Sequence, residues 1–204
     1  IALNDFNLQP FQGIISNVVN LQGYVTASLS VDGSIKSPLI NGNVSLDSGE
    51  LLLSQTPNKL ENISAEIEID NNQAEVLGSF FIKDNQATLN GLVAWQKDLT
   101  MNIDLYAKQV PLVFPPQLVM EVSPRLNFLL EEKVLNVSGK LNVLEGSYNI
   151  EKLPQGSINT SNDVIIIDVH GKEVFKEKST LAIKTDVRIN IEKAFTVSGQ
   201  GLES

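Results

Sequence analysis

The segment "NGNVSLDSGELLL", residues 41–53, alternates apolar and polar side chains between two glycines, Gly42 and Gly49. A similar segment, "SGKLNVLEGSYNI" at residues 138–150, repeats the alternation and the glycine spacing later in the chain. Alternation with a period of two is typical of a β-strand with one apolar face. Two such strands, separated by other alternating segments, indicate a long sheet built by degenerate repetition, in which glycines allow the sheet to coil.

The same period recurs along most of the chain after residue 24. About twelve strands are expected, and the clearest of them cover 25–31, 63–69, 74–82, 87–93, 99–105, 126–130, 135–143 and 181–191. Most of the joins are short and polar, so neighbouring strands are expected to pair antiparallel as a meander. Clean alternation predicts that one face of the sheet is apolar and the other is wet.

Two segments depart from this period. Between Leu8 and Leu21 the apolar residues recur at three and four positions, which predicts one short helix near residues 10–19, with Pro10 suited to its first turn. The segment "VPLVFPPQL" carries three prolines that cannot donate to a ladder, so it is expected at a sheet edge or at an internal boundary near 111–117.

The composition limits the classes of protein to which this chain can belong. The 204 residues are expected to form a single elongated β domain, 1–204, and the Ile start and "GQGLES" end suggest a fragment of a longer chain. The formal charge of −9 argues against nucleic-acid binding and against attraction to an anionic membrane surface. With no cysteine there is no disulfide and no thiol chemistry. Neither an 18-residue apolar run nor a signal peptide is present in these residues.

Sites for catalysis, metals or cofactors are not predicted. The single histidine, His170, shares a strand face with Asp168, but two ligands do not make a metal site. Glu66 and Glu68 lie on the wet face of one strand and are interpreted as solvated charges. Nucleotide-binding glycine motifs are absent as well. An enzyme is therefore not expected, and a hydrolase working through Asp168 and His170 is the third hypothesis considered.

The opening segment also resembles a known family. "VDGSIKSPLINGNVSLDSGELLL", residues 31–53, is similar to a repeated element of the TamB family, with matches at Gly33, Pro38, Leu39, Gly42 and Gly49. The stretch 120–168 resembles the conserved-domain portion of the same family, in which a strand pair and a glycine-bounded strand precede an l-P loop. Together the two stretches cover roughly a third of the chain.

The resemblance implies an AsmA-like periplasmic section of a long protein anchored in the inner membrane of double-membrane bacteria. It implies an all-β fold, a long curved antiparallel sheet folded into an open apolar trough called a β-taco. It further implies a link to TamA, an outer-membrane barrel of the Omp85 family. Autotransporter and outer-membrane protein assembly, and movement of phospholipids between the membranes, are the implied processes.

The first functional hypothesis is thus a non-enzymatic conduit or chaperone that shelters phospholipid acyl chains or amphipathic β-strands. An exposed trough also predicts dimerisation of the isolated fragment. The alternative is a closed β-sandwich serving as an adhesin or carbohydrate-binding module. The residues expected to line the groove are Val25, Ala27, Leu29, Val31, Val44, Leu46, Leu51, Leu53, Ile63, Ile67, Ile69, Val76, Phe80, Leu89, Val93, Met101, Ile103, Leu105, Leu126, Phe128, Leu130, Leu135, Val137, Leu141, Val143, Leu181, Ile183, Val187, Ile189 and Ile191.

Overall fold

The structure is a computed structural model that describes residues 1–15, 17–34, 37–54, 57–96, 98–115, 117–149, 181–193, 195–199 and 202–203. Its elements are almost all strands. They are β1 (Ala2–Asn7), η1 (Gln9–Phe11), β2 (Val18–Ser34), β3 (Ser37–Leu53), β4 (Leu60–Asn71), β5 (Gln73–Ile82), β6 (Asn85–Ala94), β7 (Thr100–Ala107), β8 (Val110–Phe114), β9 (Leu118–Glu131), β10 (Val134–Asn149), β11 (Ala182–Ile191), β12 (Phe195–Gly199) and β13 (Leu202–Glu203).

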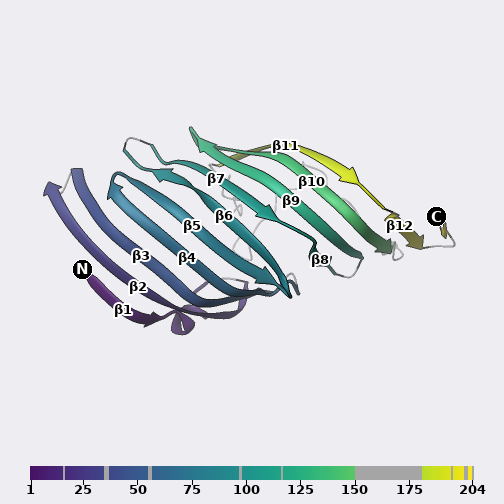
Figure 1. Cartoon of the computed structure of the whole chain (residues 1–204), viewed down its shortest axis with the longest axis horizontal. Helices are drawn as coiled ribbons and strands as arrows, with labels where there is room; N and C mark the ends of the chain where they lie inside the picture. The colour runs from purple at the N-terminus through teal and green to yellow at the C-terminus, as the bar shows by residue number, and fades with distance from the viewer. Residues whose placement is uncertain are drawn as a thin grey trace, which may run out of the picture.

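All of the described strands belong to one open sheet (Figure 1). From β1 to β7 each strand pairs antiparallel with its neighbour in sequence, and β7 then pairs with β9 and β9 with β10. The expected antiparallel meander is therefore confirmed over this part. The described strands do not form the two facing sheets that the β-sandwich hypothesis requires.

The C-terminal strands depart from the meander. β11 and β12 both pair parallel with β10, β11 along Val134–Val143 and β12 along Gly146–Asn149. β11 and β12 therefore lie one after the other along the same strand, β10. Alternation alone does not distinguish a parallel from an antiparallel neighbour, because both present side chains with the same period.

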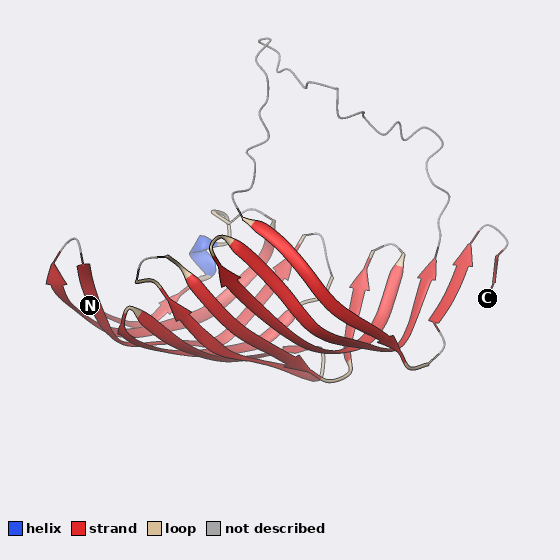
Figure 2. Cartoon of the chain, turned by 90° about the horizontal axis from the view of Figure 1, so that it is seen from above, coloured by secondary structure: helices blue, strands red, loops and turns tan. Residues whose placement is uncertain are grey.

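A line of irregularities crosses the sheet and bends it. The register shifts next to Gly23 on β2, between Leu46 and Gly49 on β3, and between Val143 and Glu145 on β10. The ladder beside β9 is also interrupted, because β7 and β8 pair with different parts of β9. Extra residues in a ladder bend a strand and increase its twist, so the sheet curves into an open trough (Figure 2).

The repeated glycine motif has the same structural role in β3 and β10. Gly42 and Gly139 have φ angles of +139° and +129°, and a Cβ at either would collide with a carbonyl oxygen of the neighbouring strand. Seven residues later, beyond the bulge, a Cβ at Gly49 would lie 2.7 Å from Ile63 Cβ, and one at Gly146 would lie 2.7 Å from the Phe195 ring. The motif thus marks strands that cross the bend.

The buried core lies at the bend and is small. Its buried members are Ile82, Ala87, Ala107, Val110, Val122 and Val143, and partly buried residues from both sides of the bend pack against them. Val122, which has no exposed surface, is the largest fully buried side chain of the described residues. Most apolar side chains are therefore only half buried, as expected for a single layer.

The expected N-terminal helix is shorter than residues 10–19. It consists of one 3-10 turn, Gln9–Phe11, because β2 already begins at Val18. The Phe11 ring lies against the Phe6 ring of β1, with centroids 5.5 Å apart. The Gln12 side chain hydrogen-bonds with backbone groups of β2, where it takes the place of a pairing strand.

The proline-containing segment forms β8, which pairs with β9 on one side only. The other side is bonded by Asn58, from the loop between β3 and β4. Its Nδ2 donates to Val113 O at 2.8 Å, and its Oδ1 accepts from Val113 N at 2.9 Å. The expected edge position is thus observed, whereas the boundary near 111–117 and the single-domain organisation remain predictions.

Substitution of Gly42 and Gly139, the positive-φ glycines of the repeated motif, is expected to destabilise the fold. A side chain in this backbone region is strained by about 1–3 kcal/mol, and the collision with the neighbouring strand adds to that cost. Gly42→Ala and Gly139→Ala should each lower the midpoint of urea unfolding. Gly13→Ala is the matched control, because a Cβ there meets no atom within 4 Å; equal midpoints for all three variants would contradict this account.

Loss of the Asn58 side chain is expected to weaken the β8 edge. Asn58→Ala leaves a backbone donor and a backbone acceptor of Val113 without these partners, which costs about 1–3 kcal/mol when such groups are partly buried. Denaturant unfolding should show a lower midpoint with an unchanged slope. Asn90→Ala, at an exposed position of β6, should change stability by less than about 0.5 kcal/mol.

Candidate apolar trough

The register arranges the apolar side chains in continuous rows, because directly opposed residues of paired strands point to the same face of a sheet. The first row is Phe6, Val25, Leu46, Ala65, Gly78, Leu89, Leu105, Leu126, Gly139 and Val187. The second row is Leu3, Ala27, Val44, Ile67, Val76, Gly91, Ile103, Phe128, Val137 and Thr185. The third row is Leu29, Gly42, Ile69, Ala74, Val93, Met101, Leu130, Leu135 and Ile183.

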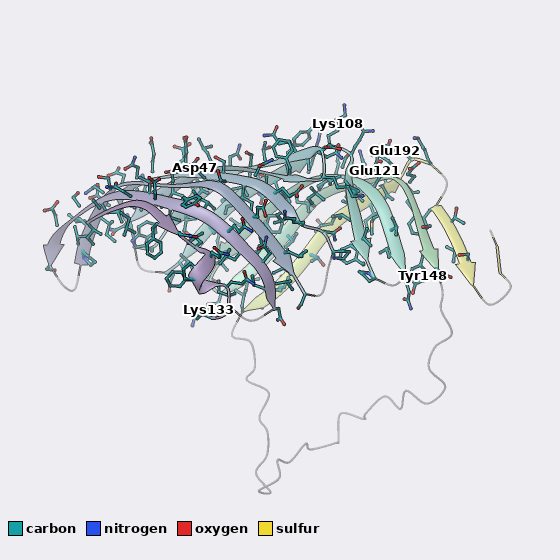
Figure 3. All side chains as sticks on the ribbon, turned by 90° about the horizontal axis from the view of Figure 1, so that it is seen from below. Asp47, Lys108, Glu121, Lys133, Tyr148 and Glu192 are labelled. Carbon is teal, nitrogen blue, oxygen red and sulfur yellow. The ribbon has the colours of Figure 1, made fainter. Side chains whose placement is uncertain are left out.

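None of these three rows contains a charged residue, and Thr185 is their one polar side chain. Asp47, Glu121 and Glu192 project from the convex side of the sheet (Figure 3). Leu46 of the first row precedes Asp47 on β3, and successive side chains of a strand point to opposite faces, so the rows follow the concave face. The concave face therefore presents an uncharged apolar surface that extends over ten strands.

The remaining predicted positions lie near the bend or at the rims. Leu51 pairs with Leu21 and Leu60, and Leu53 with Val18, in the part of β3 beyond the bend. The other predicted positions near the bend are Ile63 and Phe80, which are opposite Gly49 and Ala87. Leu141 is opposite Ile189, and Val143 is opposite Val122 on one side and Ile191 on the other. Val31 pairs with Ile40 at one end of β2, and Leu181 precedes β11 beside a hollow of about 420 Å³ that Leu99 and Leu130 also line.

Exposure differs along the trough. The side chains in the middle strands are half buried, whereas those of β11 are open: Ile183 is 64% exposed, Ile189 62% and Ile191 58%. β11 is the long strand at the C-terminal edge of the described sheet, and no described strand covers its outer side. Apolar surface of this kind is unfavourable in water, so the trough is suited to holding an apolar ligand.

Several lining residues were missed by the sequence analysis. Leu112 on β8, Met120 on β9 and Phe195 on β12 pack against the core beyond the bend, and Leu3 and Phe6 extend the rows onto β1. Alternation in residues 110–114 could have indicated Leu112, but the prolines argued against a central strand. Phe6 is separated from Leu3 by a register shift, which obscures the period of two.

The side chains offer no arrangement for metal binding within the described residues, where no three His, Cys, Asp or Glu residues gather. His170 and Asp168 lie outside the described residues. Within the described part, no helix is long and apolar enough to span a membrane.

Charged groups of the convex side stabilise the part of the sheet beyond the bend. Lys59 Nζ lies 2.9 Å from Glu50 Oε2 and 3.1 Å from Glu61 Oε1, and Asn20 donates to Glu50 at 3.2 Å. The hydrogen bond from Lys59 lowers the pKa of Glu50 below its usual 4.5, and the bonds to Glu50 and Glu61 raise the pKa of Lys59 above 10.5. These groups are solvent-exposed, so salt screens them.

The pH dependence of this network follows from the two shifts. The contribution of Glu50 is present above pH 4.5 and is lost as the pH falls through its lowered pKa; that of Lys59 is present below 10.5 and is lost as the pH rises through its raised pKa. Lys59→Met should therefore lower the Tm between these limits, and the difference from the unmodified chain should shrink in high salt and as the pH falls through the lowered pKa of Glu50. Lys83→Met, at a turn, should show no such pH-dependent difference.

Comparison with known proteins finds similarity to a protein-family model and to curated proteins. The family model described as the TamB C-terminal domain matches residues 77–204. The protein named translocation and assembly module subunit TamB from Haemophilus influenzae is 23% identical over 215 residues, which cover 100% of this chain and 17% of that protein. The chain thus spans about a sixth of the length of this relative. No solved structure matches the chain.

Proposed function

The chain belongs to the TamB family, and on that premise we propose that it is a non-enzymatic conduit or chaperone segment of the bacterial envelope. Its trough shelters phospholipid acyl chains, or amphipathic β-strands of nascent outer-membrane proteins, as they cross the aqueous space between two membranes. The observation that carries this proposal is the uncharged concave surface, continuous in register across ten strands.

The energetics support an acyl chain as cargo. Each methylene moved from a membrane into water costs about 0.8 kcal/mol, so a 16-carbon chain left unprotected faces a cost on the order of 10 kcal/mol. A surface of Leu, Ile and Val that stays apolar along its whole length removes most of that cost. A single charge on the path would restore part of it, because the chain would have to pass a hydrated group.

The location and partners are part of the same proposal. The relative from Haemophilus influenzae is named as a subunit of a translocation and assembly module, and the sequence resemblance implies TamA, an Omp85-family barrel, as the partner of the full-length protein. We place this segment in the periplasm, as part of a protein anchored in the inner membrane. Outer-membrane protein assembly, including that of autotransporters, and phospholipid transport are the processes it would serve, and a dimer of the isolated fragment stays a prediction.

Native mass spectrometry tests the choice of cargo. The chain, purified from bacterial membranes in mild detergent, is expected to retain phospholipid as a discrete mass increment. Release of that increment by delipidation should increase binding of a hydrophobic dye, while thermal unfolding stays cooperative. A chain that carries neither lipid nor an extended polypeptide, and that binds no dye, would refute the conduit.

A matched pair of substitutions on β11 tests the apolar path. Ile189→Arg places a charge on the concave face at a side chain that is 62% exposed, so the guanidinium reaches water and the fold is expected to persist. Asn190→Arg places the same charge on the convex face one residue later. In the full-length protein we expect Ile189→Arg to reduce complementation of a deletion strain at least tenfold, and Asn190→Arg to complement normally.

Protein level and circular dichroism are measured for both variants. Full complementation by Ile189→Arg, at normal protein level, would show that the concave face of this segment is not the path.

A further inference from the structure

The convex face carries a row of side chains that the trough does not use. One continuous line of opposed residues crosses seven strands and contains only hydroxyl-bearing and cationic side chains. In order, these are Ser64, Ser79, Thr88, Tyr106, Arg125, Lys140 and Arg188. The row contains no carboxylate, in a chain with 24 acidic residues and a formal charge of −9.

The three cations of this row stand directly opposite one another on β9, β10 and β11. Arg125 pairs with Lys140, and Lys140 pairs with Arg188. Like charges that are directly opposed in a sheet are destabilising. Within the described part of the chain, the ion pairs all involve Lys59, so these three cations repel one another without a carboxylate partner.

We propose that Arg125, Lys140 and Arg188 form a binding site for a phosphate group on the convex face. Neighbouring strands lie about 4.8 Å apart, so the three Cα atoms span roughly 10 Å, a distance that these long side chains bridge toward one anion. Arginine presents paired N–H donors that match phosphate oxygens, and lysine supplies a further point charge. A bound phosphate replaces the mutual repulsion of the cations with attraction.

Tyr106 positions one side of this site. The guanidinium carbon of Arg125 lies 5.2 Å from the centre of the Tyr106 ring. A guanidinium held by an aromatic ring keeps its charge and loses part of its freedom, which lowers the entropy lost on binding. The hydroxyl of Tyr106 continues the row of donors beside the cations.

The width of the row favours a single phosphate group over an extended anionic surface. The adjacent row of the convex face carries Asp104 and Asp186, each two residues from a member of the donor row. A flat sheet of negative charge would be repelled by these carboxylates, whereas one phosphate group contacts the cations alone. The source of the group is either a soluble phosphoester or the headgroup of one phospholipid.

Titration of the 204-residue chain with inorganic phosphate tests the site, at an ionic strength held constant with chloride. We expect the Tm to rise with phosphate concentration and to saturate. The variant carrying Arg125→Gln, Lys140→Gln and Arg188→Gln should bind phosphate at least tenfold more weakly. Removing the repulsion should leave this variant folded and at least as stable as the unmodified chain at low salt, as judged by circular dichroism.

A matched variant controls for net charge. Lys83→Gln, Lys108→Gln and Lys133→Gln remove the same charge at exposed positions outside the row, and phosphate affinity should change by less than twofold. A Tm that responds equally to phosphate and chloride, or an equal loss of affinity in both triple variants, would overturn the proposal.

Vesicles distinguish the two sources of phosphate. Binding to largely zwitterionic vesicles that carry a small share of phosphatidylglycerol, retained by the control variant and lost in the Arg125, Lys140 and Arg188 variant, supports a lipid headgroup, because such vesicles present isolated phosphate groups and no continuous anionic surface. Saturable binding of free phosphate without vesicle binding supports a soluble phosphoester. Vesicle binding that persists in the variant without these three cations contradicts the site.

Discussion

The structure depends on the preservation of side-chain parity across the whole sheet. A shift of one residue would transfer every side chain of a strand to the opposite face, and the apolar rows would be interrupted at that strand. The irregularities at the bend respect this constraint. Leu46 and Gly49 are three residues apart on β3, and the bulge between them keeps both on the concave face. The sheet can therefore bend without exchanging its apolar and polar faces.

A bend made in this way produces a trough instead of a closed core. The buried residues are few and small, with Val122 the largest that is fully buried in the described part, and they gather where strand segments from both sides of the bend meet. Elsewhere the apolar side chains have neighbours beside them but no layer above them. The same backbone arrangement thus provides enough packing to hold the bend and leaves an apolar surface open.

The sequence predicts most of this arrangement because alternation reports directly which side chains share a face. The apolar rows, the antiparallel order from β2 to β7 and the role of the glycine motif follow from that signal, whereas β1 was not predicted. Bulges are harder to recognise, since the residues within them, such as Ser48 and Asn62, are ordinary polar residues with positive φ. The parallel pairing of β11 and the strand character of β8 depend on tertiary contacts. Met120 and Phe195 were missed for the same reason, and Leu112 was missed because of the prolines in its segment.

The meander of neighbours in sequence gives the sheet a modular character. Each strand from β2 to β6 is held mainly by the strand before it and the strand after it, as repeats are held in a solenoid. One additional hairpin would lengthen the sheet by two strand spacings, roughly 10 Å, and would leave the curvature and the apolar rows unchanged. Length and cross-section are therefore independent variables in this architecture: the number of hairpins sets how far a trough reaches, while the width that a ligand encounters stays the same.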